Sequence, residues 1–158
     1  MRILIILFFL LPLFSWAEPE TIRPNVKTPT SFAIVVDRQS YEHAKSSIEA
    51  YRDAIEQDGL ATYILIDEWQ SPEVIRDLLK ELHTNHQMPL EGAVFIGDIP
   101  IPMIRDAQFL TSAFKMDQKR PWHQSSIPSD RYYDDFDLQF DFLKQDSLRP
   151  LYFYYSLN

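Results

Sequence analysis

Three aspartates follow three apolar stretches of the sequence. Asp37 comes after FAIVV, Asp67 after ATYILI and Asp98 after AVFIG. If the stretches are parallel strands, the three carboxylates lie along one edge of a sheet, which is where ligands of such sheets bind. Neighbouring carboxylates can share a proton or a water. Aspartate is also a common residue at strand exits and helix caps. The sequence therefore offers these three residues as candidates at a strand-end rim and assigns none of them to catalysis.

A second acidic group is concentrated in one short segment. Asp130, Asp134, Asp135 and Asp137 fall within eight residues. Oxygen-rich clusters of this kind can bind calcium, which takes about six to eight oxygen ligands from flexible loops. The spacing differs from an EF-hand loop, and the glycine that such a loop requires is absent. A solvated acidic turn is the favoured interpretation, with calcium as the one candidate cofactor.

Other kinds of chemistry find little support. The chain has no cysteine, so it has neither a thiol nucleophile nor a disulfide framework. Its four histidines form no HExxH motif, and no serine lies in a GxSxG motif. With three glycines in all and no GxGxxG or P-loop motif, a phosphate-binding loop is not indicated. The sequence therefore assigns no catalytic and no cofactor-binding residue.

Apolar stretches and helical patterns alternate in the first two thirds of the chain. The stretches Phe32–Val36, Ala61–Ile66 and Ala93–Ile96 have the continuous apolar character of strands buried on both faces. Ser40 is the expected N-cap of a helix between the first two, and Ser71–Pro72 opens a helix between the second and third. The residues expected on the buried helix faces are Ala44, Ile48, Tyr51 and Ile55, then Val74, Ile75, Leu78, Leu79 and Leu82.

This order gives two consecutive βαβ units, whose crossovers are right-handed. The fold class predicted is α/β, three layers (α-β-α) with a mainly parallel sheet, and with the first strand at or near the centre. Beyond Asp98 the pattern weakens. A proline-containing turn at Ile99–Pro102 ends the third strand, a short helix is possible around 107–114, and Leu138–Leu143 alternates as a half-buried strand does. The apolar run Leu151–Tyr155 suggests that a further segment covers it, so the domain is predicted to be incomplete.

The N-terminus has the form of a secretory signal peptide. Met1–Arg2 is a basic start, Ile3–Phe14 is apolar, and Ser15-Trp16-Ala17 is a small-x-small cleavage site. An uncleaved N-terminal anchor is the alternative. The expected organisation is a signal peptide at 1–17, a linker with three prolines at 18–30, and an α/β subdomain at 31–158. The protein is therefore predicted to be exported, to the periplasm or the exterior, with no stable membrane span after cleavage.

The charge of the chain narrows the choice of partners. The formal net charge is −8, and it becomes −9 after cleavage because residues 1–17 contain Arg2 and no acidic residue. An acidic chain is poorly suited to nucleic acid or to anionic membrane surfaces. We expect no nucleic-acid partner.

Four segments, taken in order, resemble the N-terminal subdomain of the gingipain-like cysteine peptidases, which belong to the caspase-like superfamily. They are FAIVV with its helix and Asp-Gly turn, ATYILIDEW leading into SPEVIRDLLKEL, AVFIGDIPIP, and IPSDRYYDDFD. The last is similar to a Ser-Asp-x-x-Tyr segment of the family. The resemblance covers about residues 31 to 140. No single segment is specific, and the ordered set carries the resemblance.

The resemblance implies a function that this chain does not complete. Members of the family have two adjoining α/β subdomains, and a histidine and a cysteine in the second perform peptide hydrolysis. Here there is no cysteine, and no histidine precedes a glycine. The implied protein is an exported N-terminal portion of a cysteine-type peptidase that is inactive alone. Its implied partners are the missing C-terminal catalytic subdomain and a protein or peptide substrate, with Asp98 and Asp130 shaping the rim toward that subdomain. A stand-alone, flavodoxin-like binding module without catalysis stays open as the alternative.

We predict that export is accompanied by cleavage between Ala17 and Glu18, because the basic start, apolar run and small residues match a signal peptidase site. N-terminal sequencing of exported protein should give Glu18 first. A chain that keeps Met1 and stays in the membrane fraction would support the anchor instead.

Overall fold

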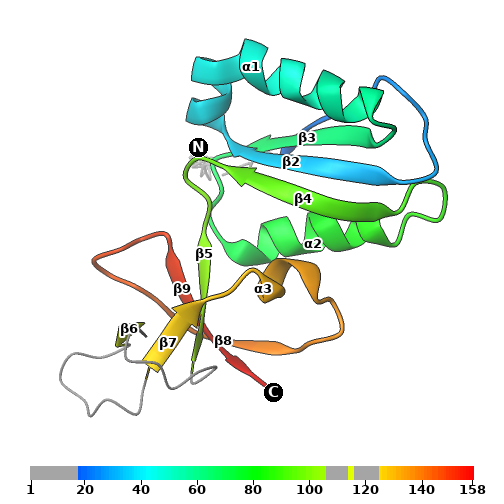
Figure 1. The fold of residues 1–158 in the computed structure, drawn as a ribbon. Helices are drawn as coiled ribbons and strands as arrows, with labels where there is room; N and C mark the ends of the chain where they lie inside the picture. The colour runs from blue at the N-terminus through cyan, green and yellow to red at the C-terminus, as the bar shows by residue number, and fades with distance from the viewer. Residues whose placement is uncertain (1–17, 106–113, 116–124) are drawn as a thin grey trace, which may run out of the picture.

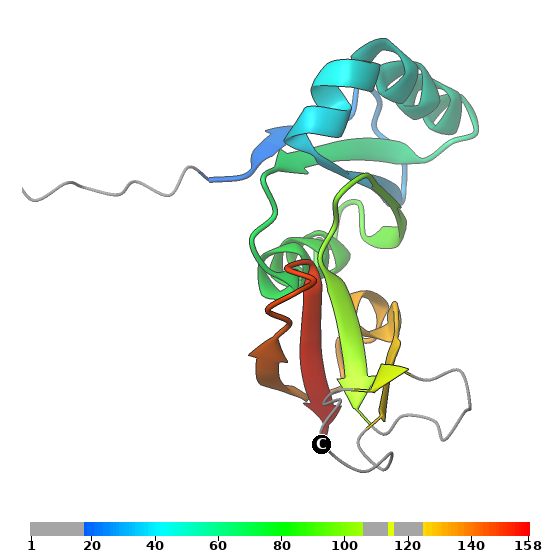
Figure 2. The same ribbon diagram turned by 90° about the vertical axis from the view of Figure 1, so that its left-hand side faces the viewer.

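The computed structural model describes residues 18–105, 114–115 and 125–158. Over these ranges the chain is a mixed α/β protein with two small mixed sheets (Figures 1 and 2). The elements in order are β1 (Glu20–Ile22), β2 (Ser31–Asp37), α1 (Arg38–Gln57), β3 (Ala61–Asp67), α2 (Pro72–His83), β4 (Leu90–Ile96), β5 (Ile101–Arg105), β6 (Phe114–Lys115), β7 (Ser125–Pro128), α3 (Arg131–Asp134), β8 (Phe140–Gln145) and β9 (Tyr152–Leu157).

The first sheet contains the three predicted strands in the order β1-β3-β2-β4. Strand β2 pairs in parallel with β3 on one side and with β4 on the other, so the predicted pairing and the internal position of β2 are confirmed. Helix α1 covers one face of this sheet and α2 lies on the other (Figure 1). Alternate residues of β2 therefore face different helices: Ile34 and Val36 join the cluster with α1, and Ala33 and Val35 join the cluster with α2.

The segment 18–30, expected to be a poorly ordered linker, is held by hydrogen bonds. Its residues Glu20–Ile22 form β1, which pairs antiparallel with β3. Farther along, the amide of Asn25 donates to the Glu56 carboxylate at 3.0 Å, and the Thr28 hydroxyl accepts from the amide of Ala61 at 2.8 Å. The three prolines lie outside β1, so none of them interrupts its pairing with β3.

Helix α1 starts earlier and faces differently from the prediction. Its N-cap is Asp37, and Ser40 lies inside the first turn. Tyr41 and Ile48 are buried as a pair seven residues apart, while Tyr51 is 44% exposed. The prediction was wrong for Tyr51, because the buried stripe runs through positions 41 and 48 and residue 51 falls on its flank. The helix also departs from helical dihedral angles at Ala44.

Helix α2 agrees more closely with its sequence pattern. Pro72 occupies the first turn, and Ile75 and Leu79 are buried against the sheet. Leu78 and Leu82 are partly buried and pack on the same cluster. Val74 is 38% exposed, so its assignment to the buried face was wrong. The apolar stripe is thus one residue narrower than the sequence suggested.

The second sheet has the strand order β6-β7-β5-β9-β8. Only β5 and β9 are parallel; the other pairs are antiparallel. The chain leaves the first sheet at Gly97 and begins the second at Ile101, a strand that the sequence did not predict. One mainly parallel sheet is therefore replaced by two small mixed sheets. The short helix expected around 107–114 falls largely outside the described residues.

The run Leu151–Tyr155 lies mostly in β9, between β5 and β8. Phe153, Tyr154 and Tyr155 are buried by other residues of this chain, although we expected a following segment to cover them. The Tyr154 hydroxyl donates to Asp146 at 3.0 Å and the Tyr155 hydroxyl donates to Glu73 at 2.6 Å. The aromatic run is therefore part of the core that the two sheets share.

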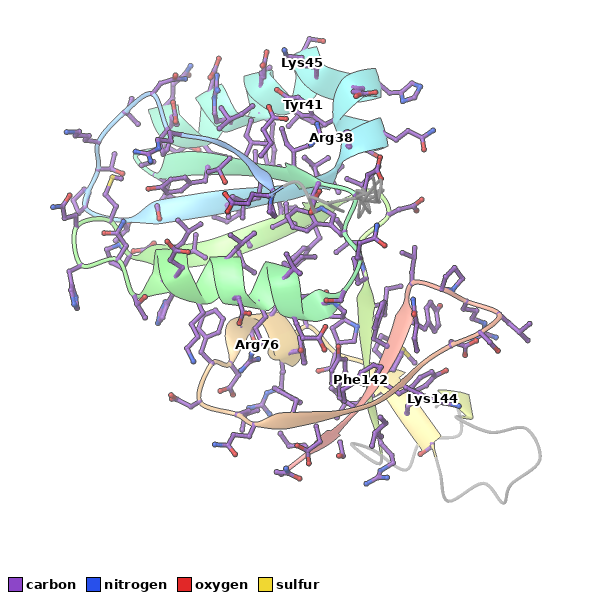
Figure 3. The ribbon with its side chains drawn as sticks, turned by 180° about the vertical axis from the view of Figure 1, so that it is seen from behind. Arg38, Tyr41, Lys45, Arg76, Phe142 and Lys144 are labelled. Carbon is purple, nitrogen blue, oxygen red and sulfur yellow. The ribbon has the colours of Figure 1, made fainter. Side chains whose placement is uncertain are left out.

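Arg76 of α2 connects the first sheet to the segment that follows β7. Its guanidinium donates to the main-chain carbonyl of Tyr132, and to the carbonyls of Asp135 and Leu138 at 3.0 Å each. It also lies over the rings of Tyr132, Phe136 and Phe140, with centroid distances of 5.1, 5.6 and 5.1 Å. Figure 3 shows Arg76 between α2 and the lower part of the molecule. Guanidinium is planar and weakly hydrated, so one side chain can make both kinds of contact.

We predict that Arg76→Met lowers the free energy of unfolding by about 2–4 kcal/mol, because three carbonyls lose a charged donor. Arg76→Lys should recover only part of this, since an ammonium cannot reproduce the planar fork. Chemical denaturation measures both variants. The matched control is Arg131→Met, which removes a 67% exposed ion-pair partner of Asp135 and should cost less than about 1 kcal/mol. Equal losses for Arg76→Met and Arg131→Met would contradict the assignment.

Candidate functional site

Asp37 lies where β2 ends and α1 begins, at the strand-end edge of the first sheet. One of its carboxylate oxygens accepts from the amide of Ser40 at 2.9 Å, and the other accepts from the amide of Asp98 at 2.9 Å. The first bond caps α1. The second spans 61 residues and fixes the loop after β4 to the end of β2. A single carboxylate therefore holds a helix start and two strand ends together.

Gly97 is required at the position beside this carboxylate. Its φ is +84°, in the left-handed region that side chains other than glycine rarely adopt. A Cβ placed there would lie 1.7 Å from Oδ2 of Asp37 and 2.3 Å from the Ser40 hydroxyl. The Gly97-Asp98 pair thus has a local structural reason: glycine lets the backbone approach, and the following amide binds Asp37.

The ionisation of Asp37 follows from these contacts. Burial raises the pKa of its carboxyl, but hydrogen bonds from Ser40, Asp98 and Gln39 outweigh that effect and lower the pKa below its ordinary value. The carboxylate is consequently ionised at neutral pH, and each of its oxygens accepts from a backbone amide. Such a group is well suited to a structural role and poorly suited to accepting a proton from a substrate.

The structure brings together two of the three predicted rim residues. Asp37 and Asp98 line a hollow of about 380 Å³ with Trp69 and Arg38. Asp67 is the register partner of Asp37 in β3, but it does not line this hollow. The Trp69 indole donates to the carbonyl of Val36 at 2.9 Å, which ties the loop after β3 to the same edge. Hydrogen bonds within the chain therefore hold the strand-end edge of the first sheet together, and the hollow lies beside it.

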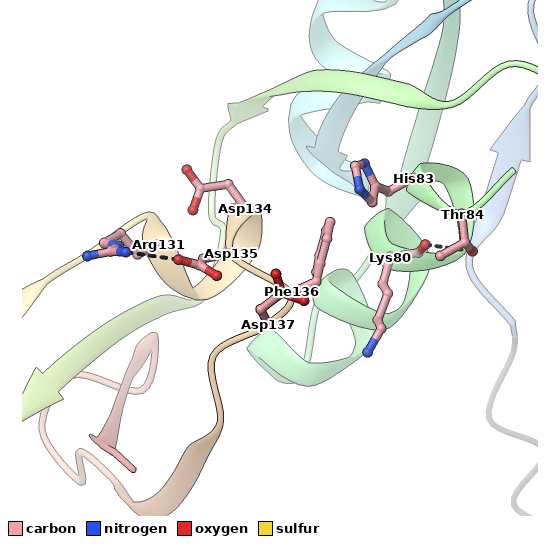
Figure 4. A pocket seen from close by; sticks show the side chains of 8 residues that line it. All are labelled: Lys80, His83, Thr84, Arg131, Asp134, Asp135, Phe136 and Asp137. Carbon is pink, nitrogen blue, oxygen red and sulfur yellow. Dashed lines mark hydrogen bonds and ion pairs between the residues drawn. The ribbon is translucent and has the colours of Figure 1, made fainter. Parts of the chain in front are cut away.

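The structure places the aspartates of the acidic segment around α3 at two hollows. Asp135 accepts from Arg131 at 2.9 Å, and Asp134, Asp135 and Asp137 line a hollow that also contains Lys80 and Arg131 (Figure 4). Asp130 lines a different hollow, next to β4. Among the described residues, no group of three or more histidine, aspartate or glutamate side chains is arranged to hold a metal ion. Calcium remains only a candidate from the sequence.

His83 and His86, three residues apart in the sequence, have different surroundings. His83 packs against Phe136 with ring centroids 5.3 Å apart, and its Nδ1 lies 3.2 Å from the carbonyl of Leu90. His86 lies beyond the end of α2 and is exposed. His83 is the last residue of α2, and its ring serves as a packing surface.

A cluster of tyrosines below α2 was not predicted from the sequence. The rings of Tyr132 and Tyr155 lie 4.4 Å apart, and the Tyr133 hydroxyl donates to the carbonyl of Pro100 at 2.6 Å. Burial raises the pKa of Tyr132 to about 12 and raises those of Tyr133 and Tyr155 as well. All three hydroxyls are therefore neutral at pH 7, and those of Tyr133 and Tyr155 donate to the Pro100 carbonyl and the Glu73 carboxylate. The signal was present as the pairs Tyr132-Tyr133 and Tyr154-Tyr155, but only the fold shows that they meet.

No protein-family model matches this chain, and no curated protein and no solved structure matches it either. The candidate site is thus argued from its geometry. Within the residues that the structure describes, none of the helices has the length and apolar composition of a membrane span. The predicted signal peptide, residues 1–17, lies outside the described residues.

We predict that Asp37→Asn lowers the free energy of unfolding by about 1–3 kcal/mol at neutral pH, because the charge is lost and an NH2 group replaces one of the two oxygens that accept from backbone amides. The loss should depend on pH in a defined direction. A lowered folded-state pKa stabilises the fold above the ordinary value of 3.8, and this contribution fades as pH falls through the folded pKa. The difference between the two proteins should therefore shrink in acid. Denaturant titrations at several pH values measure it, and a difference that grows in acid would refute the assignment.

Proposed function

We propose that this chain is the exported N-terminal portion of a gingipain-like cysteine-type peptidase, and that it is inactive by itself. The observation that carries the proposal is that the four resembling segments fall on helices and strands in the same order along the chain. FAIVV is β2, ATYILI is β3 followed by α2, AVFIGD is β4 with its exit, and SDRYYD enters α3. The support is thus an ordered set of elements that includes a structurally explained Gly97-Asp98 turn.

In this proposal the first sheet with α1 and α2 corresponds to the three-layer part of the family's N-terminal subdomain. Two of its three strand pairings are parallel. The bond between Asp37 and the amide of Asp98 holds the rim of that subdomain in place. A catalytic second subdomain would supply the thiol, since this chain has no cysteine. It would also supply the histidine that acts with the thiol. Peptide or protein would be the substrate of the assembled enzyme.

A second candidate is a stand-alone exported binding module without catalysis. The docking of Phe153–Tyr155 between β5 and β8 favours it, because the aromatic run that suggested a missing segment already has partners. A ligand of such a module would be sought first in the hollow lined by Asp37, Asp98 and Trp69. The two candidates differ in whether a second subdomain creates activity.

We predict that the purified chain hydrolyses no peptide, because thiolate chemistry needs a cysteine and none is present. Mixed peptide substrates, assayed from acidic to neutral pH with and without calcium, provide the measurement. Turnover that survives a thiol-blocking reagent and disappears in Asp98→Asn would identify an aspartate-based hydrolase and would overturn the proposal.

Inactivity alone fits both candidates, so a companion measurement is needed. Adding a gingipain-like second subdomain, with its His-Gly pair and strand-end cysteine, should give peptidase activity that a thiol-blocking reagent abolishes. The same subdomain alone is the control. Activity that is the same with and without this chain would favour the binding module.

A further inference from the structure

Strand β4 ends the first sheet on the side away from β1, and no described strand pairs with its outer edge (Figure 1). A strand at the end of a sheet presents a row of backbone N–H and C=O groups that another strand can bind. The residues Gly92 to Ile96 are half-buried, whereas Ala33 to Val36 of the neighbouring β2 are fully buried. One side of β4 therefore has no strand partner among the described residues.

Apart from Glu91 near its start, β4 lacks the usual protection of such an edge. Gly92–Ile96 (GAVFI) contains no charge and no proline. Its side chains contribute to both faces of the sheet: Ala93 and Phe95 pack on the α2 side, and Val94 and Ile96 on the α1 side. This is the pattern of a strand with a neighbour on each side. The opposite edge, β1, has only three residues and one of them is Glu20.

An apolar groove runs beside this edge. It has a volume of about 720 Å³ and is lined by β4 together with side chains of α2 and the α3 region, among them Leu79, Phe95, Tyr133 and Phe136. The rings of Phe95 and Tyr133 lie 4.8 Å apart and form part of its wall. A strand added to β4 would direct alternate side chains toward this groove, which is the usual geometry of strand addition.

The charges around the groove are of one sign. Glu91, Asp130 and Asp134 line it together with His83, and none of the described lysines or arginines does. These three side chains are exposed, and none has an ion-pair partner among the described residues. The nearby cations are Lys80 and Arg131 in the adjoining hollow, and Arg131 is paired with Asp135. A ligand of opposite charge is therefore favoured.

The acidic side chains around the groove indicate which kind of molecule binds at the outer edge of β4. A second copy of this chain would bring the same three acids against themselves, and each copy has a net charge of −8. We propose that the outer edge of β4 binds an extended, basic segment of a partner protein as an added strand. Its apolar side chains enter the groove beside Phe95, and its lysines or arginines approach Glu91, Asp130 and Asp134. This surface lies apart from the Asp37 edge and does not depend on the proposed peptidase function.

The first test uses the full chain and a short synthetic lysine–valine peptide in which every second residue is threonine and the positions between them alternate lysine and valine, so that both kinds of side chain face the groove. We expect saturable binding by fluorescence anisotropy, and slowed amide exchange in β4. Two further peptides carry N-methyl groups on alternate residues, one on the odd and one on the even positions. An added strand directs only one of these two sets of amides at β4, so one methylated peptide should lose binding and the other should keep it.

The second test reverses the charge of the groove. Glu91→Lys combined with Asp134→Lys should weaken the lysine–valine peptide by about tenfold or more and should improve a glutamate–valine peptide. The matched control, Asp53→Lys with Asp58→Lys at α1, changes the net charge equally and should alter affinity by less than about twofold. Circular dichroism confirms that both variants fold.

Three results would overturn the proposal. They are no saturable binding of the lysine–valine peptide, equal binding of the two methylated peptides, and equal effects of the two charge reversals. A dimer in solution whose formation protects the amides of β4 would show that a second copy occupies the edge, and would also reject the basic segment.

Discussion

The arrangement of the two sheets depends on the guanidinium of Arg76. Three main-chain carbonyls of residues 132–138 accept from it, and three aromatic rings of the same region surround it. Carbonyls at the ends of short elements need donors when they lose water. One charged side chain provides these donors on the surface of α2. The contact holds α3 against α2, and residues of both helices line the groove beside β4.

The acidic residues of the chain fall into two groups with different physical roles. Asp37 is nearly buried, accepts two backbone amides and has a lowered pKa, so its charge holds the strand-end edge together. Glu91, Asp130 and Asp134 are exposed and have no ion-pair partner within the described ranges. The sequence cannot separate the groups by residue type. The separation requires knowing which backbone amides face each carboxylate, and that depends on the fold.

Local pattern was sufficient for the first sheet, because its strands are continuous and apolar and its helices have an apolar stripe. It identified β2, β3, β4, α1 and α2 and their parallel pairing. It failed for the second sheet, where β5 contains Pro102 and β9 pairs with a strand about fifty residues earlier. It also placed Asp37 and Asp98 correctly at one edge, but not their bond, since a contact across 61 residues has no local signal.

The outer edge of strand β4 is relevant to both proposals. Its residues have the character of an internal strand, so some further chain at its outer edge would complete the burial of Val94, Phe95 and Ile96. A gingipain-like second subdomain and a basic partner segment would each achieve this. They differ in how far their affinity would depend on the charges of Glu91, Asp130 and Asp134. A folded subdomain buries its own apolar surface against β4, and its affinity then depends mainly on contact area and packing. An isolated strand buries little, so it depends on backbone pairing and on Glu91, Asp130 and Asp134. The salt sensitivity of whatever binds at β4 is therefore the property that distinguishes them.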